Sequence, residues 1–305
     1  MRIHSTATLP FVAWLLVVLL YGALAGCSPD SQSTDAAKDA ETHDNKVELV
    51  YVPWSSEKAS SHVVQAVIEQ ELGLECSLQP LTLIAMWESI AAGDKDGMVA
   101  GWLPTLQARF LQKFQSEVRD LGPNLQGTMI GLVVPEYVDV ESIAGLSCCA
   151  EKFDNRIIGI DPHAGIMQKS EEAIAEYNLQ GFQLISGSES TMLSALEKAI
   201  EKQEWIVVTG WTPHWKFAKF DLKYLQDPKG VFGAQERIKT IVRKGLQEEM
   251  PDVYSFLDRF YWEPEDMEKV MLAAQAEDTS YKQAAQQWVK NNQDKVQDWI
   301  THQDD

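Results

Sequence analysis

The sequence reads Met98-Val-Ala-Gly-Trp102-Leu-Pro104 in its first third and Val207-Val-Thr-Gly-Trp211-Thr-Pro213 in its last third. Each copy is a short apolar or β-branched run that reaches a Gly-Trp pair and breaks at a proline two residues later, as the end of a β-strand does. We therefore expect Trp102 and Trp211 at the carboxyl edge of a sheet, where open α/β folds bind ligands. Two such edges facing one another would form a cleft walled by indole rings, which attract cations unable to donate a hydrogen bond.

Around the two motifs the chain alternates strand-like and helix-like segments. Strands are predicted at 47–52, 77–81, around Trp102, and at 131–135, 156–160, 182–185, 205–209 and 240–242; helices are predicted at 60–72, 84–92, 106–118, 166–177, 192–201, 252–260, 264–275 and 281–291. This alternation runs through two halves and predicts an α/β fold of two doubly wound lobes around parallel sheets.

The division into lobes follows from the same pattern. We assign residues 46–135 to the first part of lobe 1, residues 136–235 to lobe 2, and residues 236–305, which are mostly helical, to a return to lobe 1. The chain would then cross between the lobes twice, near Pro135 and near Gln235, through a two-strand hinge.

The amino terminus is predicted to be separate from the fold. An apolar run ends in Leu24-Ala-Gly-Cys27, which has the small residues and the cysteine of a lipoprotein signal. Residues 1–26 are predicted to be a signal peptide, cleavage before Cys27 would leave an acylated membrane anchor, and residues 27–45 would form a disordered tether. An uncleaved anchor helix is the alternative, although the run is short for a full span. The protein is thus expected in the cell envelope, lipid-anchored and facing the periplasm or exterior, with the choice between inner and outer membrane left open.

Charge and cysteine content exclude several classes of function. The formal net charge of −19 argues against binding to nucleic acid, which needs clustered Lys and Arg. Cys76, Cys148 and Cys149 lack Cys-x-x-Cys spacing, so neither redox catalysis nor structural zinc is expected, and their pairing is left open. His62 and His163 have no partner spaced for a metal. We find no catalytic set, and predict a protein that is not an enzyme and has no cofactor.

Longer stretches resemble a known family over nearly the whole chain after Lys46. They are Tyr51-Val-Pro-Trp54-Ser-Ser-Glu57, Met86-Trp-Glu-Ser-Ile-Ala91, Asp96-Gly-Met-Val-Ala-Gly-Trp102-Leu-Pro104, Asp120-Leu-Gly-Pro-Asn124, Gly131-Leu-Val-Val-Pro135, Ile158-Gly-Ile-Asp-Pro162 with Gly165-Ile-Met167, and Thr209-Gly-Trp-Thr-Pro-His-Trp215. With these stretches the chain resembles the substrate-binding lipoproteins of ABC-type glycine betaine importers, the OpuAC family. The resemblance implies a type II periplasmic binding protein-like fold with the ligand in the inter-lobe cleft. It also implies a monomer that delivers its ligand to an ABC permease and ATPase.

The resemblance also assigns a binding site. In that family three tryptophans surround a trimethylammonium group, and they correspond here to Trp54, Trp102 and Trp211. Backbone N–H groups that hold the ligand carboxylate correspond to Gly165 and Ile166, which open a predicted helix and so would favour an anion. A quaternary ammonium or sulfonium group has no N–H to donate, so an electron-rich ring face is the surface that compensates for its lost hydration.

One position departs from the family pattern. Where well-studied relatives have a histidine that contacts the ligand carboxylate, this chain has Gln107, which can donate a hydrogen bond but carries no charge. Glycine betaine is the first choice of ligand, and carnitine, dimethylsulfoniopropionate, choline and trimethylamine oxide stay open. Trp215 would either pack behind Trp211 or form a further wall, and His214 would support the site or transfer a proton. A sensory ligand-binding protein and a methylated-amine enzyme are the alternatives from other classes.

Overall fold

The computed structural model describes residues 46–233 and 235–301. The signal peptide, Cys27 and the tether, as predicted from the sequence, lie outside these residues. Within them, every helix is either too short or too polar to cross a bilayer.

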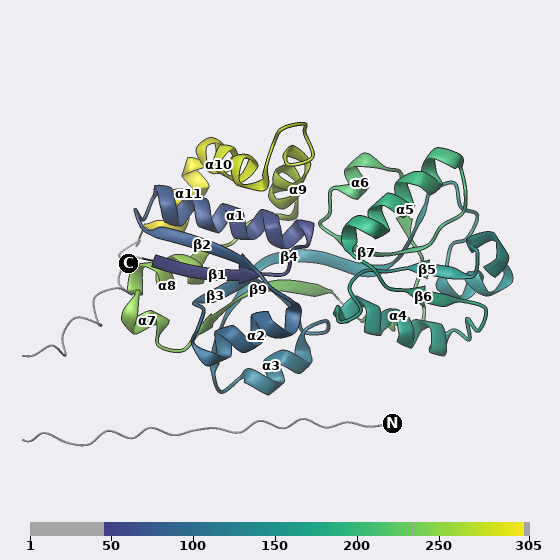
Figure 1. The fold of residues 1–305 in the computed structure, drawn as a ribbon, viewed down its shortest axis with the longest axis horizontal. Coiled ribbons are helices and arrows are strands. Elements are labelled where there is room, and N and C mark those ends of the chain that lie inside the picture. Colours follow the sequence, from purple (N-terminus) through teal and green to yellow (C-terminus); the bar gives the residue numbers. More distant parts are fainter. Residues whose placement is uncertain (1–45, 234, 302–305) are drawn as a thin grey trace, which may run out of the picture. The chain divides into compact units, whose positions relative to one another are not determined.

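One path of hydrogen-bonded strands runs through the molecule in the order β2-β1-β3-β9-β4-β7-β5-β6, with β8 paired to β4 (Figure 1). The strands are β1 (Lys46–Tyr51), β2 (Glu75–Pro80), β3 (Gly97–Leu103), β4 (Val118–Pro135), β5 (Arg156–Ile158), β6 (Gln183–Ile185), β7 (Val208–Thr212), β8 (Leu222–Tyr224) and β9 (Glu236–Arg243). Strands β1, β2 and β3 are parallel to one another, and so are β5, β6 and β7. Between these two parallel groups lie β9 and β4, which are antiparallel to their neighbours. The predicted α/β fold with two parallel sheets is confirmed, and two antiparallel strands join its halves.

Strand β4 belongs to both sheets. It pairs with β9 from Val118 to Thr128 and with β7 from Met129 to Val133. The change of partner comes earlier in the chain than the crossing expected near Pro135, and the return strand β9 starts at Glu236, beside the crossing expected near Gln235. The exact residue limits of the lobes remain a proposal.

The prediction of a helix up to Val118, followed by a strand only from Gly131, was wrong. Residues 118–130 form the first part of β4 although they contain two glycines and a proline, which are typical of turns. The strand accommodates them through three register shifts against β9, between Asp120 and Thr128, and such bulges let an irregular sequence remain paired.

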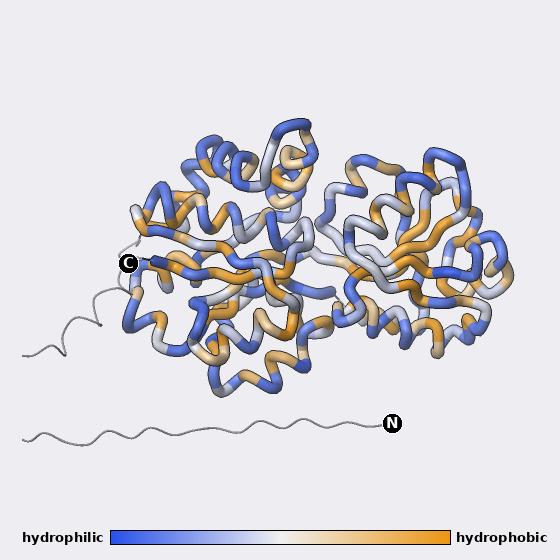
Figure 2. The backbone as a smooth tube through the Cα atoms, viewed as in Figure 1, coloured by the Kyte–Doolittle hydropathy of each residue, from blue (hydrophilic) through white to orange (hydrophobic). Residues whose placement is uncertain are grey.

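Helices cover both faces of each sheet. They are α1 (Ser55–Gln70), α2 (Leu83–Ala92), α3 (Ala108–Phe114), α4 (Gly165–Glu176), α5 (Glu189–Lys202), α6 (Lys216–Lys219), α7 (Leu246–Glu249), α8 (Pro251–Arg259), α9 (Pro264–Ala273), α10 (Tyr281–Asn291) and α11 (Gln293–Ile300), with 3₁₀ turns η1 (Ile143–Cys148) and η2 (Ala150–Phe153). On the first sheet α1 carries α9 and α10 on its outer side, while α2 and α3 pack on the opposite face; on the second, α5 and α6 lie opposite α4 (Figure 1). Figure 2 shows the apolar strands between helices whose outward turns are hydrophilic.

Three tryptophans in and between the carboxyl-terminal helices pack against one another. Trp288 and Trp299 stack with ring centroids 5.9 Å apart, and Trp262 meets Trp288 edge-on at 5.8 Å. All three are buried. Burial of such large rings contributes apolar area to the packing of these helices.

The cysteines in the described residues are free thiols. Cys76 is buried, and the Sγ atoms of the neighbouring Cys148 and Cys149 lie 2.9 Å apart near the surface. Burial raises the pKa of the Cys76 thiol well above its usual range, so this side chain behaves as a small apolar residue of the core.

Candidate ligand-binding site

A small cavity lies where strands from the two sheets end. It is lined by Trp54, Glu57, Leu83, Trp102, Leu106, Gln107, Ile160, Ala164, Gly165, Ile166 and Trp211. All six residues assigned to ligand binding from the sequence are among these. Trp54, Trp102 and Gln107 come from elements of the first sheet, whereas Trp211 and the start of α4 come from the second. The tertiary structure thus brings the predicted site residues together around one space.

The two Gly-Trp motifs place their rings in the same way. Trp102 and Trp211 are each the last residue but one of a strand, and each strand is followed by a proline whose preceding peptide bond is cis. The glycine before each Trp packs against a central antiparallel strand. A Cβ added at Gly210 would lie 2.2 Å from Cγ2 of Val133 on β4. Glycine permits this close packing because it has no side chain. Since successive side chains along a strand point to opposite faces, the indole that follows lies on the other face.

The first turn of α1 binds the polar edges of the indoles. The Trp102 Nε1–H donates to Glu57 Oε1 at 2.6 Å, and the Trp211 Nε1–H donates to Ser56 Oγ at 3.2 Å. Trp54 is the N-cap residue of the same helix. With its single polar group satisfied in this way, each of these two rings has only apolar, electron-rich surface left for the cavity that it lines.

The sequence analysis did not assign Glu57, Leu83, Leu106, Ile160 and Ala164 to the site, and of these five lining residues only Glu57 is charged. Its side chain is 2 % exposed, and it accepts hydrogen bonds from Trp102 at Oε1 and from the Ser56 hydroxyl at Oε2, the latter at 2.8 Å. Burial raises the pKa of Glu57 to about 7, although both hydrogen bonds act in the opposite direction. We predicted that this helix begins near Ser60; a start at Ser55 would have placed an acidic residue in the first turn, which is a recognised helix signal.

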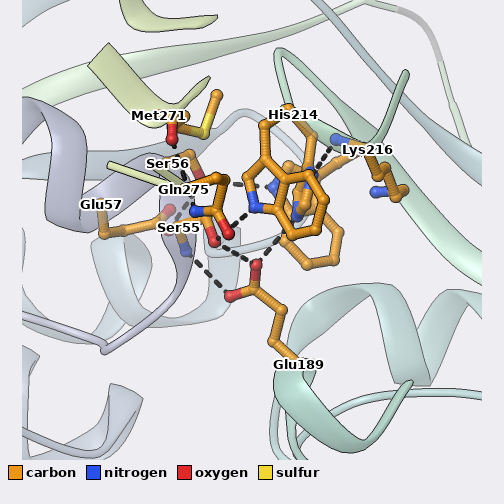
Figure 3. Close-up of polar contacts among 10 residues, drawn as sticks. Ser55, Ser56, Glu57, Glu189, His214, Lys216, Met271 and Gln275 are labelled. Atoms are coloured by element: carbon orange, nitrogen blue, oxygen red, sulfur yellow. Dashed lines mark hydrogen bonds and ion pairs between the residues drawn. The ribbon is translucent and has the colours of Figure 1, made fainter. Parts of the chain in front are cut away.

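A second buried carboxylate joins the two sheets. Glu189, the first residue of α5, accepts from the Ser55 backbone N–H at 2.8 Å and from the Ser55 hydroxyl at 2.5 Å (Figure 3). Burial by itself would raise the pKa of Glu189, but hydrogen bonds from His214 and Ser55 outweigh it and the pKa is lowered. The carboxylate also lies at the positive end of the α1 dipole, which favours its charge.

His214 holds Glu189 from the other side. Its Nδ1 accepts from the Lys216 backbone N–H at 3.0 Å, so the neutral ring carries its proton on Nε2 and donates it to Glu189 Oε1 at 2.8 Å (Figure 3). Burial, with a smaller contribution from Lys216, lowers the pKa of His214 to about 4. The imidazole is therefore neutral at neutral pH and orients its neighbours.

Trp215 lies outside the small cavity. Its ring centroid is 5.5 Å from that of His214, which in turn meets Trp211 edge-on at 4.9 Å. The Trp215 Nε1–H donates to Ser55 Oγ at 3.3 Å, and its ring lines a wider cleft of about 890 Å³. Of the two roles left open by the sequence, this geometry favours packing behind Trp211.

The Gln107 side chain lines the cavity but is largely committed to the protein. Its Oε1 accepts from the Trp87 Nε1–H at 2.9 Å, and its Nε2 donates to the Ala100 carbonyl at 3.0 Å. One amide N–H is left for a ligand. A contact between Gln107 and a ligand stays a prediction. In the structure its side chain connects Trp87 to the backbone of β3.

The start of α4 offers backbone donors to the cavity. Gly165 and Ile166 are its first two residues, and no acceptor among the described residues meets their N–H groups. A Cβ added at Gly165 would lie 2.3 Å from the Leu106 carbonyl oxygen, so only glycine lets this helix approach the segment after β3 so closely. Free N–H groups at a helix start suit an anionic group.

The described residues contain no group of His, Cys, Asp and Glu side chains positioned to hold a metal ion. The cavity instead combines indole faces, a buried carboxylate and free backbone N–H groups. Such a set can bind a compact molecule with a positive and a negative end.

Comparison with known proteins identifies the family. Residues 45–291 match the OpuAC family model, described as the substrate binding domain of ABC-type glycine betaine transport systems. The chain belongs to this family.

Individual OpuAC relatives agree with this membership. The solved structure of lactococcal OpuAC, closed and complexed with glycine betaine, superposes with a TM-score of 0.80 at 44 % identity and covers 85 % of this chain and 100 % of that one. ProX of Borrelia burgdorferi, a glycine betaine/L-proline-binding protein, gives a TM-score of 0.81 at 35 % identity over 84 % of this chain and 97 % of that one. The glycine betaine/carnitine transport binding protein GbuC of Listeria monocytogenes is 50 % identical over 151 residues, or 49 % of this chain. That match spans 50 % of GbuC, about half its length.

Lys216 is a buried amine against the Trp211 ring of the site. Its side chain is 0 % exposed, its Nζ lies 4.4 Å from the centroid of the Trp211 ring, and no described residue accepts a hydrogen bond from it. Burial lowers the pKa of Lys216 to about 7. The folded state therefore disfavours the ammonium form that the unfolded chain keeps up to about pH 10.

We predict that Lys216→Met raises the free energy of unfolding by about 2 kcal/mol at neutral pH. The substitution removes a desolvated, unpaired cation and replaces it with an apolar side chain of similar volume. Between about pH 7 and pH 10 the unfolded wild type binds more protons than the folded one, so its stability rises with pH, whereas the variant lacks this rise. Urea unfolding at about pH 7 and about pH 9 measures both effects.

The matched control is Lys219→Met, since that amine is half exposed and pairs with Glu197. It should change stability by less than about 0.5 kcal/mol. Equal stability of Lys216→Met and wild type at both pH values would show that the buried amine is not desolvated.

Proposed function

We propose that this protein is an extracytoplasmic receptor that binds a compact quaternary ammonium or sulfonium zwitterion, with glycine betaine as the first choice, and delivers it to an ABC permease and its ATPase. The receptor acts as a monomer and releases its ligand chemically unchanged. Membrane attachment through an acylated Cys27 completes the proposal, and it rests on the sequence signal alone.

The observation that carries this proposal is the convergence of Trp54, Trp102 and Trp211 on one cavity from both sheets. A trimethylammonium group has no hydrogen to donate, so ring faces and apolar contact are what can replace its water. Each face contributes about 0.5–2 kcal/mol. Micromolar affinity needs about −8 kcal/mol, so the other end of the ligand and contacts between the lobes must supply the remainder.

The free N–H groups of Gly165 and Ile166 support a ligand that also carries an anionic group. A carboxylate there would accept two backbone hydrogen bonds at the positive end of the α4 dipole. This favours glycine betaine, carnitine or dimethylsulfoniopropionate over a simple cation.

A second candidate ligand class is choline or trimethylamine oxide, which carry no carboxylate. The observation in its favour is that both polar ends of Gln107 are bound to Trp87 and Ala100. Isothermal titration calorimetry with glycine betaine, carnitine, dimethylsulfoniopropionate, choline and trimethylamine oxide separates the two classes. A tighter Kd for the carboxylate-bearing compounds supports the first choice, and a tighter Kd for choline or the oxide supports the second.

Trp102→Ala and Trp211→Ala should each weaken glycine betaine binding at least about tenfold, because each removes one ring face and the methyl contacts with it. Calorimetry gives the Kd, and circular dichroism checks that both variants fold. Trp205→Ala is the control, since this half-buried ring packs on Phe153 away from the cavity. If all three variants bind as wild type does, the box of rings is not the binding site.

Gly165→Ala should weaken glycine betaine binding at least about tenfold, because the added methyl group collides with the Leu106 carbonyl and separates α4 from the other sheet. Its stability without ligand should change little if the lobes can part. Gly181→Ala is the control, because it adds the same methyl group at an exposed position outside the cavity lining, where the nearest atom would be Ala150 Cβ at 3.3 Å. A Gly165→Ala variant with wild-type affinity would mean that the bound form does not bring these two segments together.

A further inference from the structure

Glu57 is a buried carboxylate without a protein cation. Among the ion pairs of residues 46–233 and 235–301, none involves Glu57, and the side chains that donate to its two oxygens are Trp102 and Ser56. An ionised carboxylate removed from water is costly unless an opposite charge or strong hydrogen bonds compensate. Two donors compensate only in part, and burial accordingly raises the pKa of this group to about 7.

Glu57 also lines the cavity to which Trp54, Trp102 and Trp211 contribute. A cation held there by the ring faces would lie beside it, in surroundings where charges interact more strongly than in water. The hydrogen bond that the Trp102 Nε1–H donates to Glu57, 2.6 Å long, also favours a bound cation. It draws positive charge of the indole toward the carboxylate and leaves the ring face more negative.

We propose that Glu57 is the counter-charge of the binding site and makes it selective for ligands with a permanent positive charge. This inference rests on the proposed function and adds a residue to it. The indole faces disfavour ligands whose cationic group donates hydrogen bonds, and the carboxylate disfavours neutral molecules of the same shape. The ligand in turn completes the pairing that the protein leaves open at Glu57.

Proton release follows from this pairing. A bound cation favours the ionised form of Glu57, so binding displaces a proton from the fraction of molecules in which the group is protonated. Affinity for a cationic ligand is therefore full above about pH 7 and falls as the pH drops below it.

The contribution of Glu57 to the pH dependence of binding has to be distinguished from those of the titratable groups around it. Glu189 from α5 has a lowered pKa, Tyr281 from α10 has its pKa raised to about 12, and His214 has its pKa lowered to about 4, so these three do not titrate near neutrality. Lys216 does, with a pKa of about 7. The pH series is therefore repeated in Lys216→Met.

The test compares glycine betaine with 3,3-dimethylbutanoate, in which a neutral carbon replaces the quaternary nitrogen. Wild type should prefer glycine betaine, and Glu57→Gln should reduce that preference about tenfold, which corresponds to about 1.4 kcal/mol. Glutamine keeps an oxygen to accept from Trp102 while it removes the charge. Asp266→Asn is the matched control, because that carboxylate is also buried but pairs with Lys295 away from the cavity; its ligand preference should equal that of wild type.

A measurement on the unmodified protein covers the case in which Glu57→Gln does not fold. Calorimetry at about pH 6.5 in buffers of different ionisation enthalpy counts released protons, and glycine betaine should release them, in wild type and in Lys216→Met, whereas 3,3-dimethylbutanoate should not. Failure of wild type to bind glycine betaine or any other compound of the calorimetry panel would refute the proposed function. Normal binding with an unchanged preference in Glu57→Gln, or without proton release, would refute the role of Glu57 alone.

Discussion

The site depends on hydrogen bonds between the first turn of α1 and the edges of the indole rings. Ser56 and Glu57 accept from Trp211 and Trp102, which come from different sheets. Trp54 is the N-cap residue of the same turn. One short segment of backbone therefore carries one of the three tryptophans and orients the rings of the other two. An indole has only one polar group, so fixing that edge fixes the direction of the whole ring. The cavity is therefore formed by rings with little freedom to turn, which lowers the entropy lost on binding.

Three charged side chains, Glu57, Glu189 and Lys216, are buried around this turn, although packing of a core requires only apolar residues. Glu189 is matched by Ser55, His214 and the α1 dipole, and it stays ionised. Glu57 has hydrogen bonds but no cation, and Lys216 has an aromatic face but no acceptor among the described residues. Unmatched buried charges reduce stability, and they are concentrated at functional sites more often than elsewhere. Their position beneath the rings agrees with a site whose electrostatics serve a cationic ligand at some cost to the fold.

The central antiparallel strands explain how the two halves meet. Strand β4 pairs with β9 in one sheet and with β7 in the other, so a single run of backbone carries both parallel groups. The carboxyl ends of β3 and β7 then face a common space, which is where open α/β sheets bind ligands. Membership in the OpuAC family and the agreement with lactococcal OpuAC are in keeping with this arrangement.

The sequence by itself determined the α/β alternation, the two strand ends at Trp102 and Trp211, and, through family motifs, the helix start at Gly165. These are local signals: periodicity, proline breaks and short fixed spacings are readable within a few residues. Only the tertiary structure decided that residues 118–130 extend as a strand, because pairing with β9 overrides their turn-like glycines and proline. It likewise decided the burial of Glu57, Gln107 and Lys216 and the contacts that their side chains make. Burial and hydrogen-bond partners of a side chain depend on segments far away in the chain, and no local pattern records them.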